Sequence, residues 1–211
     1  MGRHTVPSDA KRFPTERLRP RRGEIYAYIF ENPLAGVPLG VYWNFFLPFR
    51  RLKYCDEVID CALLADWATP DVRDWRDLEG TSLEGTAARM IEGSLYVGEH
   101  DPLTRIDVRI GERRGRAFRV RWDVTAGFEG FFGDDADPAL RVVSEAWMDF
   151  DGISIDRDLL PAEGSPKRHA AALAQKFVDV SAFGILQRNH RTHEDRGFLL
   201  RPTRSRKRWD R

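Results

Sequence analysis

Two consecutive segments of this chain alternate strictly between apolar and polar side chains. They lie at residues 105–110 and 118–124, and a hairpin turn is expected at residues 112–115 between them. Because successive side chains of a β-strand point to opposite faces, a period of two predicts a hairpin of two strands. Its buried face would hold seven apolar side chains: Ile106, Val108, Ile110, Phe118, Val120, Trp122 and Val124. A shift of the pairing by one residue would expose all of them, so we expect a firm register.

The opposite face of this hairpin is charged. Asp107 and Arg109 on the first strand would lie near Arg119, Arg121 and Asp123 on the second. Opposite charges on neighbouring strands stabilise a sheet, so we expect ion pairs across the hairpin.

Further strands and three helices are expected around this hairpin. Apolar residues at helical spacing predict a helix over residues 52–63, with a strand over residues 58–64 as the alternative. Thr69-Pro70-Asp71 is typical of a helix start, here of a short helix that ends at Gly80. Ser165-Pro166 indicates a last helix, which ends at Gly184. The further strands are expected over residues 23–31, 37–46, 90–98, 140–150 and 153–156, with a hairpin turn at Asp151-Gly152.

This order of elements predicts an α+β fold. We expect a curved antiparallel sheet of six to seven strands packed on a C-terminal helix, with one or two short helices inserted after the second strand. Over residues 24–184, the order is similar to the helix-grip architecture of START-like lipid-binding proteins. That likeness lies in element order alone, and fold does not determine function.

Charge is unevenly distributed along the 211 residues. Residues 1–23 carry seven Arg or Lys against two Asp or Glu, a net +5, and residues 188–211 carry nine against three, a net +6. Because the whole chain has a net charge of +1, residues 24–187 carry −10. We therefore expect residues 1–22 to be a basic, mobile tail, residues 23–187 a single α+β domain, and residues 188–211 a second basic tail.

The sequence also indicates a compartment. No apolar segment follows the basic N-terminal residues, so we expect no secretory signal. The longest uncharged run, residues 32–49, contains prolines and glycines, and we expect no membrane span. Cys55 and Cys61 are the two cysteines, which does not imply a disulfide framework. Together these features predict a cytoplasmic protein.

One motif invites a catalytic interpretation. Asp149-Phe150-Asp151-Gly152, at the end of an apolar strand, resembles the first motif of haloacid-dehalogenase-type phosphatases, in which one carboxylate attacks phosphate and the other handles the proton. That fold needs a long downstream segment, and here only residues 153–211 follow. An Asp-Gly hairpin turn explains the same residues. We therefore assign no catalytic residue.

Metal and nucleotide motifs are similarly weak. His190 and His193 could meet one metal ion on a helix, but further ligands are not evident. A calcium loop placed on Gly152 would put Trp147 at its first ligand position, and tryptophan cannot bind calcium. Neither glycine-rich phosphate-binding pattern occurs. The sequence predicts no metal site and no cofactor.

Residues 127–138 set three phenylalanines among glycines and acids. If the rings are exposed, they form an aromatic anchor rimmed by carboxylates, which suits a basic protein partner. If they turn inward, they belong to the core, which is the interpretation that we favour. The candidate partner-binding residues in this loop are Phe128, Phe131, Phe132, Asp134 and Asp135.

Three functions follow. The first is a non-catalytic intracellular binding protein whose acidic body engages a protein partner, in an adaptor or neutralising role. The second is a nucleic-acid-associated protein that uses its basic tails. The third is a small-molecule carrier or enzyme with a pocket between the sheet and the last helix, where Asp149 and Asp151 would be tested first. The candidate nucleic-acid-binding residues are Arg204, Arg206, Lys207, Arg208 and Trp209.

Overall fold

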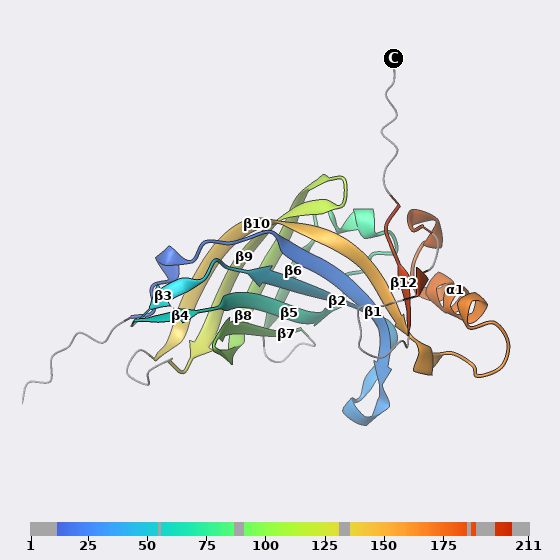
Figure 1. The fold of residues 1–211 in the computed structure, drawn as a ribbon, viewed down its shortest axis with the longest axis horizontal. Helices are drawn as coiled ribbons and strands as arrows, with labels where there is room; N and C mark the ends of the chain where they lie inside the picture. The colour runs from blue at the N-terminus through green and yellow to red at the C-terminus, as the bar shows by residue number, and fades with distance from the viewer. Residues whose placement is uncertain are drawn as a thin grey trace, which may run out of the picture.

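The computed structural model describes residues 12–54, 56–86, 91–130, 136–184, 187–188 and 197–203 (Figure 1). Within these ranges the chain is mostly antiparallel sheet, and its one α-helix, α1 (Pro166–Phe177), comes late in the sequence. The expected α+β class and antiparallel sheet are therefore confirmed. The strands are β1 (Gly23–Asn32), β2 (Val37–Pro48), β3 (Leu52–Tyr54), β4 (Glu57–Ile59), β5 (Cys61–Ala68), β6 (Ser82–Thr86), β7 (Glu92–Val97), β8 (Glu99–Arg114), β9 (Ala117–Phe128), β10 (Asp137–Asp156), β11 (Gln187–Arg188) and β12 (Gly197–Leu200).

The sheet closes on itself. β1, β2, β5, β7, β8, β9 and β10 pair in that order as antiparallel neighbours. β10 then pairs with β1 in parallel, from Gly23↔Met148 to Ile29↔Ile155. β6, β11 and β12 extend this ring to ten strands among the described residues, more than the expected six to seven. Closure removes the unpaired edges that an open sheet would present.

The alternating hairpin is confirmed. β8 and β9 pair from Leu103↔Ala126 to Arg114↔Ala117. The turn lies at residues 115–116, because residues 112–114 of the expected turn continue β8. Gly115 has a φ of 65°, a left-handed conformation that glycine adopts without a steric penalty. The seven apolar side chains of the expected buried face are each at most 3% exposed. The interior of the ring is filled by large side chains from several strands, among them Trp43, Phe45, Phe118, Trp122 and Phe150.

The helix expected over residues 52–63 is wrong. This segment forms the small hairpin β3–β4 and then β5, which lies between β2 and β7. Cys61, Leu63 and Ala65 alternate toward the interior with exposed fractions of 3% or less. Burial between two neighbouring strands has therefore overridden a helical spacing of apolar residues.

The short helix expected to begin at Thr69 is only partly present. A 3-10 helix, η3 (Trp75–Leu78), begins after Asp74, whose side chain accepts a hydrogen bond from the N–H of Arg76. Four further 3-10 helices occur in the described residues: η1 (Thr15–Arg17), η2 (Pro33–Ala35), η4 (Arg157–Leu159) and η5 (Val180–Ala182). The last helix ends at Phe177 and is followed by η5, so it is shorter than expected.

The hairpin turn expected at Asp151-Gly152 is also wrong. β10 runs without interruption from Asp137 to Asp156. Ile25 pairs with Phe150 and Tyr26 with Gly152, so Asp151 is the extra residue of a β-bulge. The Asp-Gly pair thus bends a long strand instead of reversing the chain.

The two ends of the ring are closed by different segments. At one end lie the β3–β4 hairpin and the N-terminal segment, and at the other lie α1 and β12 (Figure 1). Phe13 is 1% exposed, and its ring lies 5.0 Å from that of Phe128 and 5.5 Å from that of Tyr54. At the other end, Trp75 stacks on Phe150 at 5.4 Å.

Parts of both expected tails belong to this packed body. Arg22 forms an ion pair with Asp149, and Leu18 is buried beside Phe13. β12 pairs with β10, and Leu200 is 3% exposed. Residues 12–22 and 197–203 therefore pack against the domain expected over residues 23–187. No helix in the described part of the chain is long and apolar enough to cross a membrane.

Candidate functional site

Basic side chains are unevenly distributed between the strands of the ring. β1, β2, β5 and β7 contain no lysine or arginine. β8, β9 and β10 contain four, two and one arginine respectively. The outer surface of the sheet is thus divided into two parts of different chemistry. The net charge of the whole domain does not show this division.

The first surface, which we call the acidic face, consists of outward side chains of β1, β2, β5 and β7, joined by the first residues of β8. Register places Asp66 opposite Glu92, and Tyr96 opposite His100. Tyr28 is 43% exposed, and its ring packs edge-on against that of Tyr26 at 5.5 Å. The residues of the acidic face are Glu24, Tyr26, Tyr28, Phe46, Leu64, Asp66, Glu92, Ser94, Tyr96 and His100.

A β-bulge sets the position of Asp66 on this face. Trp43 pairs with Ala68 and Phe45 with Ala65, so Asp66 and Trp67 together oppose Asn44. The buried Asn44 side chain accepts a hydrogen bond from the N–H of Trp67 at 3.3 Å and donates one to the carbonyl of Tyr42 at 3.1 Å. Trp67 has a φ of 62°, which is rare and strained for so large a side chain. Such strain is concentrated at functional sites.

The carboxylate of Asp66 interacts with several charged and titratable neighbours on the acidic face. Burial, and then the nearby Glu92, raise the pKa of Asp66, while His100 acts in the opposite direction. Burial, followed by the charge of Asp66, raises the pKa of Tyr26 to about 12. The Tyr26 phenol therefore remains a neutral hydrogen-bond donor at physiological pH. His100 accepts or donates a hydrogen bond with Ser94 at 2.8 Å.

We expect Asp66→Asn to change how stability depends on pH. The raised pKa of Asp66 means that the folded state binds its proton more tightly than the unfolded state does. Ionised Asp66 therefore costs stability at neutral pH, and the cost disappears as the pH falls below the ordinary aspartate range. The variant should be more stable than the wild type at pH 7, with a difference that shrinks toward pH 3. Urea unfolding of both proteins at pH 7 and pH 3 measures this difference in stability. A difference that does not change with pH would contradict the raised pKa of Asp66.

The residues predicted from the sequence as partner-binding or nucleic-acid-binding are only partly described. Phe128 is 2% exposed and packs on Phe13, so its ring belongs to the core. The other members of both predicted sets lie outside the described residues: Phe131, Phe132, Asp134, Asp135, Arg204, Arg206, Lys207, Arg208 and Trp209. The roles expected for them remain predictions. The metal hypothesis for His190 and His193 likewise falls outside the described part.

Comparisons with known proteins identify no relative. No protein-family model matches the chain, and no curated protein or solved structure shows significant similarity to it.

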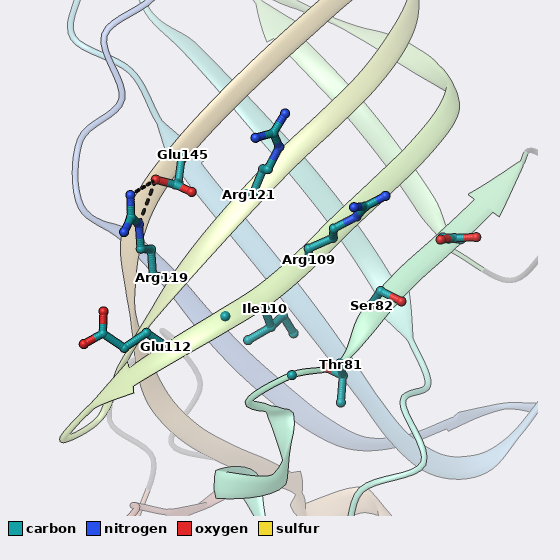
Figure 2. A pocket seen from close by; sticks show the side chains of 11 residues that line it. Thr81, Ser82, Arg109, Ile110, Glu112, Arg119, Arg121 and Glu145 are labelled. Atoms are coloured by element: carbon teal, nitrogen blue, oxygen red, sulfur yellow. Dashed lines mark hydrogen bonds and ion pairs between the residues drawn. The ribbon is translucent and has the colours of Figure 1, made fainter.

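The second surface is a groove over β6, β8, β9 and β10, which we call the arginine groove (Figure 2). Its volume is about 640 Å³, within the range of small-molecule sites. Its floor includes a β-bulge, because Gly111 and Glu112 together oppose Arg119. The charged residues that line the groove are Glu84, Arg109, Glu112, Arg119, Arg121 and Glu145.

The ion pairs expected across the β8–β9 hairpin are not formed, because the register opposes like charges. Arg109 faces Arg121, and Asp107 faces Asp123. Asp107 instead accepts two hydrogen bonds from Arg109, two residues along its own strand, both at 3.0 Å. The cross-strand ion pairs lie between β9 and β10. Arg141 binds Asp123, and Arg119 binds Glu145 (Figure 2).

Asp149, which the sequence offered for chemistry, is held in a structural ion pair. Asp149 accepts two hydrogen bonds from Arg22, and these hold the pKa of its carboxyl below the usual range. Cys61 is buried, and burial raises the pKa of its thiol to about 12. A second groove, of about 510 Å³, lies between residues 73–77 and the end of α1, at the molecular surface. A pattern search could have found the acidic face, because β1, β2, β5 and β7 lack basic residues.

Proposed function

We propose that this protein is a non-catalytic binding protein whose acidic face engages a basic protein partner. The observation that carries the proposal is that β1, β2, β5 and β7 present tyrosines and carboxylates and contain no lysine or arginine. Every charged side chain of these four strands is therefore acidic: Glu24, Glu31, Asp66 and Glu92. Electrostatic complementarity of this kind sets partner choice and the association rate.

The aromatic side chains of the acidic face add apolar contact area, which charged groups alone do not provide. Tyrosine is enriched in protein–protein interfaces because it buries a large apolar ring and keeps a polar hydroxyl. Tyr28 is 43% exposed beside the half-buried Tyr26. An exposed aromatic pair next to Asp66 and Glu24 would contact both the apolar stem and the charged head of a lysine or arginine. An adaptor or neutralising role fits such a surface, because carboxylates can occupy a basic site that otherwise binds phosphate.

The proposal predicts the effect of reversing charge on the acidic face. The full-length chain would be used to capture binding proteins from a lysate of its own organism, and the purified partner would then be titrated by calorimetry. The double variant Glu24→Lys/Glu92→Lys should weaken the complex by about a hundredfold or more, because opposed like charges cost several kcal/mol. Tyr28→Ala should weaken it by about tenfold, as expected for an interfacial aromatic anchor.

A matched control separates this face from general charge effects. Glu163 is exposed in the loop between η4 and α1 and belongs to none of β1, β2, β5 and β7. Glu163→Lys should bind the basic partner as tightly as the wild type does. Equal weakening by Glu163→Lys and the double variant would contradict the proposal, and so would a partner that is acidic.

A further inference from the structure

We propose that the arginine groove is a second binding site, for a small ligand that carries a single phosphate-type oxyanion. This site lies on β6, β8, β9 and β10, whereas the acidic face lies on β1, β2, β5 and β7, so the inference is independent of the proposed function. It rests on one guanidinium, Arg121, which makes no hydrogen bond to a described residue, and on the groove that it lines (Figure 2).

Arg121 is exceptional among the arginines that line the groove. It is exposed and forms no hydrogen bond or ion pair with any described residue. Its neighbour on β10 is Glu145, whose Oε1 already accepts hydrogen bonds from Arg119 at 2.5 and 2.7 Å. Its neighbour on β8 is Arg109, which adds a second positive charge. Arg141, and to a smaller extent Arg105 and Arg121, lower the pKa of Asp123, so Arg121 acts on that carboxylate through its charge. Its N–H donors have no described acceptor and are open to a ligand.

The other carboxylates near Arg121 are also bound elsewhere. Asp123 lies two residues along β9, but Arg141 holds it in a bidentate pair with distances of 2.8 and 2.6 Å. Glu112 accepts a hydrogen bond from Arg114 at 2.7 Å. Two arginines that face each other across a strand pair destabilise the sheet. An oxyanion between them would relieve that repulsion, because a guanidinium binds phosphate or carboxylate oxygens through parallel N–H donors.

The walls of the groove limit the ligand to a compact anion with a polar remainder. The segment that precedes β6 is fixed along β8 by two backbone hydrogen bonds, from Gly80 N–H to Ile110 at 2.7 Å and from Ile110 N–H to Thr81 at 2.9 Å. This places the exposed Ser82 at one side of the groove (Figure 2). Glu84 and Glu145 also line it and would repel an extended polyanion. A ligand with one phosphate bound at Arg121 and hydroxyl groups directed toward Ser82 meets both requirements: it is a compact anion, and the rest of it is polar.

Calorimetric titration of the full-length protein at constant ionic strength tests this site. The probes are inorganic phosphate, glycerol 3-phosphate and glycerol. We expect glycerol 3-phosphate to bind and glycerol not to bind. Binding of inorganic phosphate with equal affinity would assign the site to the oxyanion alone, and weaker binding of inorganic phosphate would assign it to the ester. Both results support the proposal.

Two variants locate the binding. Arg121→Gln should weaken binding by about tenfold or more, as expected for loss of a charge-assisted hydrogen-bond pair. The thermal unfolding temperature of this variant should be unchanged or raised, because Arg121 forms no hydrogen bond with a described side chain. Arg105→Gln, which removes an exposed charge on β8 outside the groove lining, should leave affinity unchanged. No binding of either phosphate probe at millimolar concentration, or equal loss in both variants, would overturn the proposal.

Discussion

Trp75→Ala is expected to lower the free energy of unfolding by about 3–5 kcal/mol, the cost of removing a large buried ring. Trp75 is 1% exposed, stacks on Phe150 at 5.4 Å and meets the edge of Phe118 at 6.0 Å. Its Nε1 donates a hydrogen bond to the carbonyl of Ala182 at 3.0 Å. One side chain thus joins the end of the ring to the segment after α1. Urea unfolding followed by tryptophan fluorescence measures the loss.

Trp147→Ala is the matched control for that variant. The Trp147 ring lies on the outer side of β10, half-buried beneath the guanidinium of Arg114 at 4.9 Å. Its removal should cost about 1 kcal/mol, the scale of an exposed cation–π contact and little burial. Hydrogen exchange should accelerate in α1 only for Trp75→Ala. Equal losses of stability in the two variants would show that Trp75 does not hold the end of the ring.

Gly152→Ala is expected to lower the free energy of unfolding by about 3 kcal/mol, because strain and steric overlap act together. Gly152 has a φ of 134°, which side-chain-bearing residues rarely adopt. An added Cβ would also overlap the carbonyl oxygen of Leu200, the residue of β12 that pairs with Ile153. The neighbouring strand would have to move, so amide exchange in β12 should increase.

Gly115→Ala separates these two contributions. Gly115 also has a positive φ, 65°, but a Cβ placed there meets no atom within 4 Å. Only conformational strain remains at that turn, and we expect a loss of about 1 kcal/mol. If Gly152→Ala proved no more destabilising than Gly115→Ala, the close approach of β12 to the bulge would be wrong.

The alternating segments were predictable because the pattern is local. Val108, Val120 and Trp122 alternate with charged residues, and each is fully buried in the hairpin as expected. The helical spacing of apolar residues over residues 52–63 gave a wrong prediction. β5 pairs with β2 on one side and β7 on the other, and its inward side chains are buried as part of that sheet. The spacing of apolar residues distinguishes a helix from a strand only when one face of that element is exposed to solvent.

Both candidate sites depend on register, which the sequence does not show. The hairpin was expected to pair opposite charges, yet Arg109 faces Arg121. The pairing of β1 with β10 joins residues more than 120 positions apart, and no local signal marks it. The bulges at Asp66 and Asp151 likewise need a partner strand to define them. The acidic composition of the body and the strands without basic residues were predictable, whereas only the topology shows that these strands are neighbours.

Closure of the sheet is the central claim, because it fixes which side chains fill the interior and turns both the acidic face and the arginine groove outward. The most direct measurement is disulfide formation in the double variant Tyr28→Cys/Ser154→Cys, mapped by peptide mass spectrometry. These residues are paired neighbours on β1 and β10, and paired strands bring Cα atoms within the range of a disulfide. The control Glu24→Cys/Ser154→Cys joins positions five residues out of register, because Glu24 pairs with Asp149. The account predicts rapid cross-linking of the first pair alone. Cross-linking of neither pair, or of the control pair instead, would contradict it.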